Sequence, residues 1–261
     1  MKNNVHPTAI IDESARLHES VTVGPYAVID ADVEIDAGTI IDSHVRIYRG
    51  AKIGKSNRIY HGSAIGGDPQ NVGFDFSIRS GVRIGDHNIL REFFTIHRSS
   101  EPGVDTTIGN HCFLMENTIV SHDSKLGDHV IFVHAAATSG HVVVQDYAFV
   151  SGLSAIHQFC TIGAYAMIGG CSKIVKDVPP YSTADGNPAT IIGLNTVGLK
   201  RGGFSPDARK KIKDTYKTLY HSGLNHGQAL KVLNEQNDPS PEVRAIIKFF
   251  EESDRGVTDH R

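Results

Sequence analysis

Three polar positions in the middle of the chain recur at intervals of 18 residues: His122, Gly140 and Gln158. Their neighbours in the sequence include Asp123, His141 and His157. Histidine ionises near neutral pH and can take a proton from a nucleophile, and an adjacent carboxylate such as Asp123 can orient the ring. A backbone N–H at a glycine can approach a developing oxyanion without obstruction. The set therefore suits acyl transfer to a hydroxyl or an amine.

No serine or cysteine lies beside His122 in the setting of a strained nucleophile turn. The pattern therefore favours direct attack by the acceptor over a covalent acyl-enzyme. The other histidines, among them His97, His111, His129 and His134, have weaker support for a chemical role. We assign no metal site and expect no cofactor.

A six-residue period explains the interval of 18. An aliphatic residue returns at every sixth position from Val5 to Ile65, again from Ile84 to Ile96, and from Ile108 to Ile174 with Thr138 as the exception. This period fits neither a helix nor a simple alternating strand. It predicts short parallel strands joined by tight corners, with three hexapeptides to each triangular coil and about 4.8 Å between coils. In such a parallel β-helix, His122, Gly140 and Gln158 stack in one column.

Breaks in the period predict the domain organisation. Residues 1–180 are expected to form the β-helix, with loops at 67–81 and 99–106 where the period is interrupted by Gly- and Pro-containing polar segments. Residues 181–204 are expected to be an irregular linker, and residues 205–261 a small helical domain. Its three helices should begin near Ser205, Asn225 and Ser240, because each of these residues precedes a helical apolar pattern and can act as an N-cap. The last residues, from about Ser253, are expected to be frayed.

Composition excludes several classes of protein. The 261 residues carry a net charge of -3, which gives no indication of nucleic-acid binding. No signal segment and no long apolar run is present, so we expect a soluble, cytoplasmic protein without stable membrane insertion. The three cysteines, Cys112, Cys160 and Cys171, have no metal-binding spacing and are interpreted as free thiols.

Several segments, in addition to the hexapeptide run, carry a family likeness: VSHDSKLGDHV, SGHV, AIHQFCTIGAYAMIGGCSK, KDVPPYSTADGNPAT and GLNTVGLKRGGF. Together they resemble the UDP-N-acetylglucosamine O-acyltransferases of lipid A biosynthesis, within the hexapeptide-repeat acyltransferases. The resemblance covers nearly the whole chain and is most specific in residues 82–204. It implies a mainly β fold, a left-handed parallel β-helix with a C-terminal α-helical domain. It also implies a homotrimer with active sites in clefts between subunits.

The same resemblance implies an activity and site residues. The family moves a 3-hydroxyacyl chain from acyl carrier protein to the 3-hydroxyl of UDP-N-acetylglucosamine. By this likeness His122 is the general base, Asp123 its partner and the Gly140 N–H the oxyanion donor. The implied substrate-binding residues are Gln70, His141, His157, Gln158, Asn195 and Arg201, and Gly170 matches the position that limits acyl length. Glycine at that position resembles the members that accept long chains. Basic residues that could meet the acidic carrier protein are Lys173, Lys176, Lys200 and Arg201.

Departures from the family pattern concern the acceptor. In the first loop the family has Gln-Asp-Leu-Lys-Tyr, and this chain has Gln70-Asn71-Val72-Gly73-Phe74. Ile119 stands where the family has a histidine, and Val197 where it has a nucleotide-contacting glutamate. The acceptor is therefore either UDP-N-acetylglucosamine or a different nucleotide sugar, including an amino sugar. A third hypothesis is a non-catalytic hexapeptide trimer or a zinc carbonic anhydrase-like protein, which needs three histidines around a metal between subunits.

Overall fold

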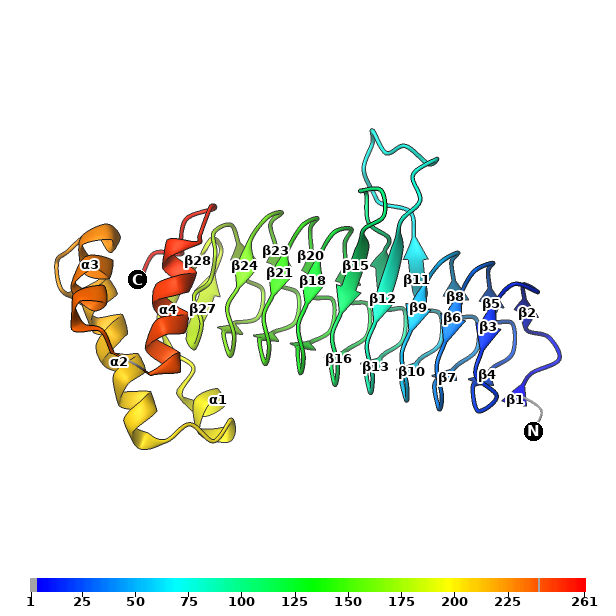
Figure 1. The fold of residues 1–261 in the computed structure, drawn as a ribbon, viewed down its shortest axis with the longest axis horizontal. Helices are drawn as coiled ribbons and strands as arrows, with labels where there is room; N and C mark the ends of the chain where they lie inside the picture. Colours follow the sequence, from blue (N-terminus) through cyan, green and yellow to red (C-terminus); the bar gives the residue numbers. More distant parts are fainter. Residues whose placement is uncertain (1–3, 239) are drawn as a thin grey trace.

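The computed structural model describes residues 4–238 and 240–261, which form a long β-solenoid with helices at its C-terminal end (Figure 1). Three parallel sheets line the solenoid, and the chain passes from sheet A to sheet B to sheet C in each coil. The mainly β, parallel β-helical fold class predicted from the period is confirmed.

The strands are short and belong to the sheets as follows. Sheet A has 11 strands, namely β1 (Asn4–Val5), β4 (Thr22–Val23), β7 (Ile40–Ile41), β10 (Arg58–Ile59), β13 (Ile89–Leu90), β16 (Phe113–Leu114), β19 (Ile131–Phe132), β22 (Phe149–Val150), β25 (Met167–Ile168), β27 (Ser182–Gly186) and β28 (Ala189–Leu194). Sheet B has 9 strands, namely β2 (Ile10–Ile11), β5 (Val28–Ile29), β8 (Arg46–Ile47), β11 (Ala64–Gly67), β14 (Thr95–His97), β17 (Ile119–Val120), β20 (Ala137–Thr138), β23 (Ala155–Ile156) and β26 (Lys173–Ile174). Sheet C has 8 strands, namely β3 (Arg16–Leu17), β6 (Glu34–Ile35), β9 (Lys52–Ile53), β12 (Gly81–Ile84), β15 (Asp105–Ile108), β18 (Lys125–Leu126), β21 (Val143–Val144) and β24 (Thr161–Ile162).

The core follows directly from the hexapeptide. Each two-residue strand between β4 and β26 buries its second side chain and leaves the first at least partly exposed, as Phe132 and Ile131 do in β19. Small or β-branched residues such as Ala136 and Val142 are buried at the corners between strands. Burying one aliphatic side chain stabilises the fold by about 1.5–3 kcal/mol, so each strand adds one such contribution.

Two loops leave the solenoid at the corner between sheets B and C (Figure 1). The first connects β11 to β12 through residues 68–80, and the second connects β14 to β15 through residues 98–104. Both lie within one or two residues of the predicted breaks. Because they leave from the same corner, they project on the same side of the molecule.

The prediction of an irregular linker over residues 181–204 was wrong. β27 pairs in parallel with β25 and so extends sheet A by one strand, and β28 returns antiparallel to β27. Helix α1 (Thr196–Arg201) follows. The aliphatic period ends at the Pro179-Pro180 pair, but strand pairing continues beyond it because Ala184 takes the inward position next to Ile168.

The C-terminal helices are α2 (Pro206–His221), α3 (His226–Gln236) and α4 (Pro241–Glu251). Their predicted starts are confirmed, since Ser205 caps α2, Asn225 forms a capping box with Gln228 on α3, and Ser240 precedes α4. A second hydrophobic cluster, separate from the solenoid core, holds them together. We propose on this basis that the chain has a solenoid domain and a helical domain. In the part of the chain that the structure describes, no helix is both long and apolar enough to cross a bilayer.

The frayed tail predicted from about Ser253 was also wrong. Val257 and Thr258 are buried, and bridges join Val257 to Asp177 and His260 to Ile191. The tail therefore packs back along the end of the solenoid through both backbone and side-chain contacts, with Asp177 among its partners. Its polar sequence did not indicate this packing.

Candidate active site

The predicted polar column lies at the corner between sheets B and C. The turn after β17 carries His122 and Asp123, the turn after β20 carries Gly140 and His141, and the turn after β23 carries His157 and Gln158. Ile119 pairs with Ala137, and Ala137 with Ala155, so the three turns belong to adjacent coils. The predicted stacking of these positions is confirmed.

His122 is oriented by the residue that follows it. Its Nδ1 lies 2.7 Å from Oδ2 of Asp123, and its side chain is only 17% exposed. An ionised carboxylate only accepts hydrogen bonds, so the Nδ1 atom must carry the proton. The Nε2 atom then has a free lone pair, and no described residue forms a hydrogen bond with it. His122 is thus arranged to accept a proton at Nε2.

Gly140 allows the His122 ring to lie against the backbone of the next coil. A Cβ atom at position 140 would stand 2.8 Å from Nε2 of His122, closer than real side-chain carbons approach. Gly140 is itself buried, yet among the described residues none accepts a hydrogen bond from its N–H. A backbone N–H without a partner in the protein can bind an acceptor on a ligand. A substrate oxyanion placed beside His122 would supply the missing acceptor.

Asp123 is buried among hydrogen-bond donors. Its carboxylate accepts from the hydroxyl of Ser99, from the N–H and hydroxyl of Ser100, and from His122. Burial by itself would raise the pKa of Asp123, but the donors from Ser100, Ser99 and His122 outweigh burial, and the pKa lies below the ordinary value. The carboxylate is therefore ionised at neutral pH.

His141 shares the same carboxylate. Its Nε2 lies 3.4 Å from Oδ2 of Asp123, and its ring stacks on Phe159 with centroids 4.7 Å apart. The ligand-type atoms of His122, Asp123 and His141 lie within 4.8 Å of one another, a spacing that a metal ion could use. This set has two histidines and one carboxylate from one chain, in contrast to the three-histidine zinc set. The carboxylate oxygens are also occupied by hydroxyl and N–H donors. The arrangement fits proton transfer, and we do not assign these residues as metal ligands.

The C-terminal tail reaches the end of the column that lies toward the C-terminus, at His157. Arg255 lies with a guanidinium nitrogen 3.2 Å from Nδ1 of His157 and 3.2 Å from the carbonyl oxygen of Val175. Gln158, next to His157, is exposed. The docked tail therefore places a cation beside a predicted substrate-binding histidine.

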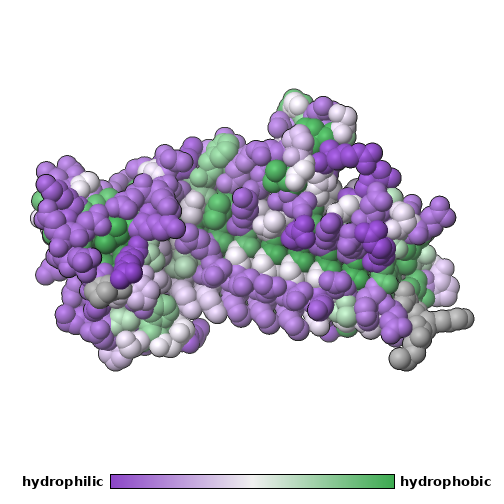
Figure 2. Space-filling model, viewed as in Figure 1, coloured by the Kyte–Doolittle hydropathy of each residue, from purple (hydrophilic) through white to green (hydrophobic). Residues whose placement is uncertain are grey.

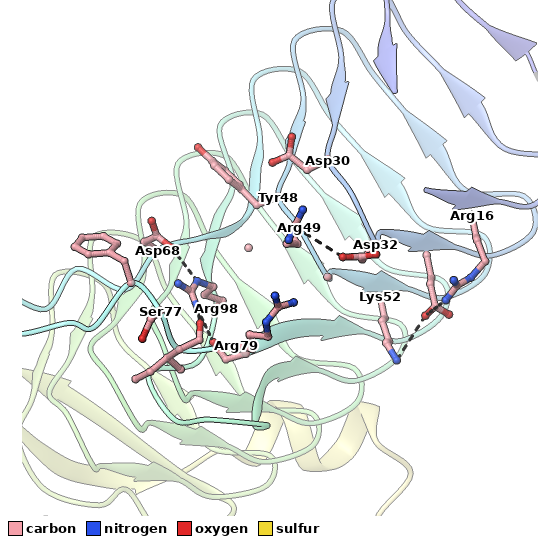
Figure 3. A pocket seen from close by; sticks show the side chains of 16 residues that line it. Arg16, Asp30, Asp32, Tyr48, Arg49, Lys52, Asp68, Ser77, Arg79 and Arg98 are labelled. Carbon is pink, nitrogen blue, oxygen red and sulfur yellow. Dashed lines mark hydrogen bonds and ion pairs between the residues drawn. The ribbon is translucent and has the colours of Figure 1, made fainter. Parts of the chain in front are cut away.

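A cavity of about 800 Å³ continues the corner toward the N-terminus and is bounded by the first loop (Figure 3). Arg98 occupies the position equivalent to His122 one coil earlier and closes the base of this loop. Its guanidinium donates to Asp68 at 2.8 Å, to the Ile78 carbonyl at 2.6 Å and to Ser80 at 3.0 Å. Gln70 and Gly73 are exposed on the loop itself.

The remaining predicted residues lie at the other two corners. Asn195 and Arg201 line a cavity of about 610 Å³ that runs beside Tyr147 and Tyr165, at the corner between sheets C and A. The Asn195 side chain caps α1 by accepting from Gly198 and also donates to the Tyr165 carbonyl. Gly170 lies at the corner between sheets A and B, where an added Cβ would meet only the Gly152 carbonyl oxygen, at 3.7 Å. One chain therefore does not bring these residues to His122.

Ser99 and Ser100 were missed at the level of sequence, as was Arg255. Ser99 follows the inward residue Ile96 by three positions, as Asp123 follows Val120, and Ile96 pairs with Val120. Counting from the period across the second loop would have placed Ser99 beside Asp123. Nothing in the sequence indicated Arg255, because its contact with His157 joins residues 98 positions apart.

Comparison with protein-family models finds one match, over residues 177–258, to the model described as "Udp N-acetylglucosamine O-acyltransferase; Domain 2". The protein of Paraburkholderia phymatum named acyl-[acyl-carrier-protein]--UDP-N-acetylglucosamine O-acyltransferase is 42% identical over 261 residues, with 98% of this chain and 99% of the relative covered. The protein of the same name from Ectopseudomonas mendocina is 44% identical over 257 residues, at 98% and 99% coverage.

Solved structures give the same result. A UDP-N-acetylglucosamine acyltransferase from Francisella novicida superimposes with a TM-score of 0.95 at 38% identity, covering 98% of this chain and 94% of that chain. The corresponding structure from Acinetobacter baumannii has a TM-score of 0.94 at 39% identity, covering 98% of this chain and all of the other, 100%. Both the solenoid and the helical end are included in these superpositions.

Proposed function

Because the chain belongs to the family of acyl-[acyl-carrier-protein]--UDP-N-acetylglucosamine O-acyltransferases, we propose that His122 is the general base of an acyl transfer. The reaction is that of the family, transfer of a 3-hydroxyacyl chain from acyl carrier protein to the sugar 3-hydroxyl, the first step of lipid A biosynthesis. One observation carries the proposal. His122 has a free Nε2 lone pair next to the unpaired N–H of Gly140, with its other nitrogen bound to Asp123.

The proposed step is a direct transfer. The acceptor hydroxyl gives its proton to Nε2 of His122 as its oxygen bonds to the thioester carbonyl carbon. The carbonyl oxygen becomes an oxyanion and accepts from the Gly140 N–H. When this intermediate collapses, the carbon–sulfur bond breaks and the imidazolium returns the proton to the leaving thiolate. Asp123 stays ionised throughout and stabilises the imidazolium through Nδ1.

The substrate contacts are proposed from the geometry of each residue. His141, His157 and Gln158 border the reacting column and would bind the sugar, phosphate or pantetheine. Arg201 and Asn195 would bind the nucleotide in the cavity at the corner between sheets C and A. Gln70, on the exposed first loop, would contact the acceptor.

A different acceptor is the second candidate, and three positions favour it. Gly73 brings no side chain to the first loop, Ile119 is 37% exposed next to the column, and Val197 is 58% exposed at the nucleotide cavity. Each replaces a polar family residue by an apolar or absent side chain. These changes leave His122 and Gly140 untouched, so they bear on which nucleotide sugar or amino sugar binds.

The space around Gly170 supports a long acyl chain. A side chain at this position would project into open space, with only a carbonyl oxygen at 3.7 Å. Gly170 therefore places no side chain at the position that would limit chain length. We propose that the enzyme accepts long 3-hydroxyacyl chains.

A homotrimer is proposed because the site residues lie at three different corners of one chain. A single site that contains His122, Gly170 and Arg201 needs neighbouring subunits. The outer faces of the sheets support this assembly. Sheet A presents a row of large apolar residues, Ile89, Phe113, Ile131, Phe149 and Met167. Sheet C presents charged residues in the same place, such as Lys52, Arg83 and Lys125.

A hydrophobic band runs along the solenoid between hydrophilic margins (Figure 2). Long exposed apolar surfaces are typical of subunit interfaces. Light scattering should give a mass three times that of the chain. We propose the acidic acyl carrier protein as the acyl donor. We also propose a cytoplasmic location, where the protein would meet that carrier.

Turnover assays test the function. The purified protein is incubated with 3-hydroxyacyl carrier proteins of several chain lengths and a panel of UDP-sugars, including UDP-N-acetylglucosamine and its 3-amino analogue. Transfer to UDP-N-acetylglucosamine supports the family reaction. Transfer to another sugar alone would assign the second candidate. No transfer at all, with stoichiometric zinc in the purified protein, would overturn both.

A further inference from the structure

The second loop makes more contacts with Asp123 than the catalytic histidine does. The Ser100 hydroxyl lies 2.6 Å from Oδ2 of Asp123, and the Ser100 N–H lies 3.1 Å from Oδ1. The Ser99 hydroxyl donates to Oδ1 as well. These donors come from residues 98–104, between β14 and β15, whereas Asp123 follows β17. The loop therefore reaches across one coil to hold the carboxylate.

Asp123 could not hold this position by itself. Its side chain is 5% exposed, and a buried carboxylate is costly unless its oxygens accept hydrogen bonds. Its N–H donates to the Thr106 hydroxyl, at the start of β15, so the backbone of the residue is also fixed by the second loop's flank. With both oxygens occupied on the loop side, the lone pairs of Oδ2 that remain point to His122 and His141.

We propose that Ser99 and Ser100 are positioning residues for acyl transfer, which hold Asp123 so that its Oδ2 atom orients His122. This inference rests on the proposed function, since it assigns a role in that reaction. Donation of Nδ1–H by His122 leaves its Nε2 as the base. The loop thus selects the tautomer of His122 without touching its ring.

The charged and titratable groups around Asp123 are few. His122 faces it from its own turn, and His141 faces it from the turn after β20. His97, on β14, is buried and interacts electrostatically with His122; burial first, and His122 second, lower the pKa of His97. No lysine or arginine among the described residues forms an ion pair with Asp123. Ser99 and Ser100 therefore donate the hydrogen bonds to Asp123 that a lysine or an arginine can donate to a buried carboxylate.

Ser100 is the cleaner position to test. Among the described residues, the Ser100 hydroxyl bonds to Asp123 alone. The Ser99 hydroxyl also accepts from the Glu101 N–H, and the Ser99 carbonyl accepts from the Ser80 hydroxyl. Ser100→Ala removes one donor, and Ser100→Thr keeps it. Ser14→Ala is the matched control, because the Ser14 hydroxyl binds the Asp12 carboxylate at 2.7 Å in the first coil, far from the column.

The experiment measures kcat, KM and the pH profile of kcat for the full-length protein, its variants included, with 3-hydroxyacyl carrier protein and the best UDP-sugar acceptor. Ser100→Ala is expected to lower kcat by roughly tenfold, the loss associated with one hydrogen bond to a charged group, with KM changed by less than about twofold. With one donor fewer, the Asp123 carboxylate is a stronger acceptor for the protonated His122 ring. Because His122 must be unprotonated to act as the base, the acid limb of the profile should move to higher pH. Ser99→Ala should act in the same direction, Ser100→Thr should restore both readouts, and Ser14→Ala should change neither.

A merely structural role gives a different pattern. If Ser100→Ala and Ser100→Thr lost activity equally, or if the acid limb did not move in Ser100→Ala, the positioning role would be wrong. Thermal unfolding of each variant identifies loss of folding as the cause. His122→Ala, assayed in parallel, separates the two levels of inference. If His122→Ala is inactive and Ser100→Ala behaves like the parent protein, only the positioning role is wrong. If His122→Ala is fully active, the proposed mechanism itself is wrong.

Discussion

Two corners of the same solenoid carry histidines in adjacent coils, and they differ in what the rings contact. At the corner between sheets C and A, His87, His111 and His129 stack in parallel, with centroids 4.9 Å apart and planes within 6°. The stack continues through Tyr147 and Tyr165 at 4.5 and 4.6 Å. At the corner between sheets B and C, His122 and His141 are perpendicular, at 90°, and both face Asp123.

This difference shows that spacing in the sequence does not by itself identify a histidine that can take part in a reaction. The stacked rings pack face to face and form a ladder. Another planar side chain can continue the ladder, as Tyr147 and Tyr165 do. A ring turned by a buried carboxylate has one nitrogen fixed and the other presented. The corner that we propose as catalytic thus differs from the stacked corner by Asp123, Gly140 and the second loop.

The largest effect is expected at His122. His122→Ala removes the proposed base and should lower kcat by about 10²–10⁴-fold, the range associated with general-base catalysis. The melting temperature should stay close to that of the parent protein, because the side chain lies outside the hydrophobic core. Steady-state assays and calorimetry check both. Substantial activity in this variant would contradict the proposal that the corner between sheets B and C is catalytic and the stacked corner is not.

Asp123→Asn should come next, with a loss of kcat on the order of 10–100-fold, because the imidazolium loses a charged partner. The pH dependence of stability has a definite sign. The pKa of Asp123 is lowered in the folded protein, so its ionised form contributes stability above the ordinary aspartate pKa of about 4, and that stability is lost as the pH falls through the lower folded value. The stability difference between parent and variant should therefore be constant above about pH 5 and shrink in acid. Chemical denaturation across pH measures it, and a difference that grows in acid contradicts the assignment.

Gly140→Ala tests the close approach at the catalytic corner. The added methyl group would meet the His122 ring, so the ring must move and leave the N–H partly covered. We expect a loss of kcat of at least about tenfold, within the range for disturbing an oxyanion donor. Gly103→Ala is not a suitable control, because Gly103 has a φ of +72°. Gly227→Ala is suitable, since its Cβ would meet only the Asn225 side chain, at 3.5 Å, and it should keep parent kcat.

The smallest effect on catalysis is expected at the stacked corner. His111→Ala interrupts the ladder and should change kcat by less than about twofold. It should lower the melting temperature by no more than about 10 °C, as expected for the loss of two ring contacts, with His87 and His129. His111→Tyr should keep the parent melting temperature, because tyrosine occupies equivalent positions at Tyr147 and Tyr165. A large loss of kcat in His111→Ala would show that both corners serve the reaction.

The amino-acid sequence by itself determined the coil and the column. The hexapeptide period repeats locally, so counting by six places His122, Gly140 and Gln158 in adjacent coils without any knowledge of long-range contacts. The helix starts are equally local, because a capping side chain bonds to a backbone two or three residues away.

Only the tertiary structure decided what surrounds the column. The pairing of Ser99 and Ser100 with Asp123 crosses a loop that interrupts the period. The contact of Arg255 with His157 depends on how the C-terminal tail packs against the end of the solenoid. The strands at β27 and β28 were missed because their pairing continues after the aliphatic period has stopped. The division of the predicted site residues among three corners also appears only in space. A period fixes which residues stack within a chain, and the packing of distant segments fixes which charges, hydroxyls and subunits meet them.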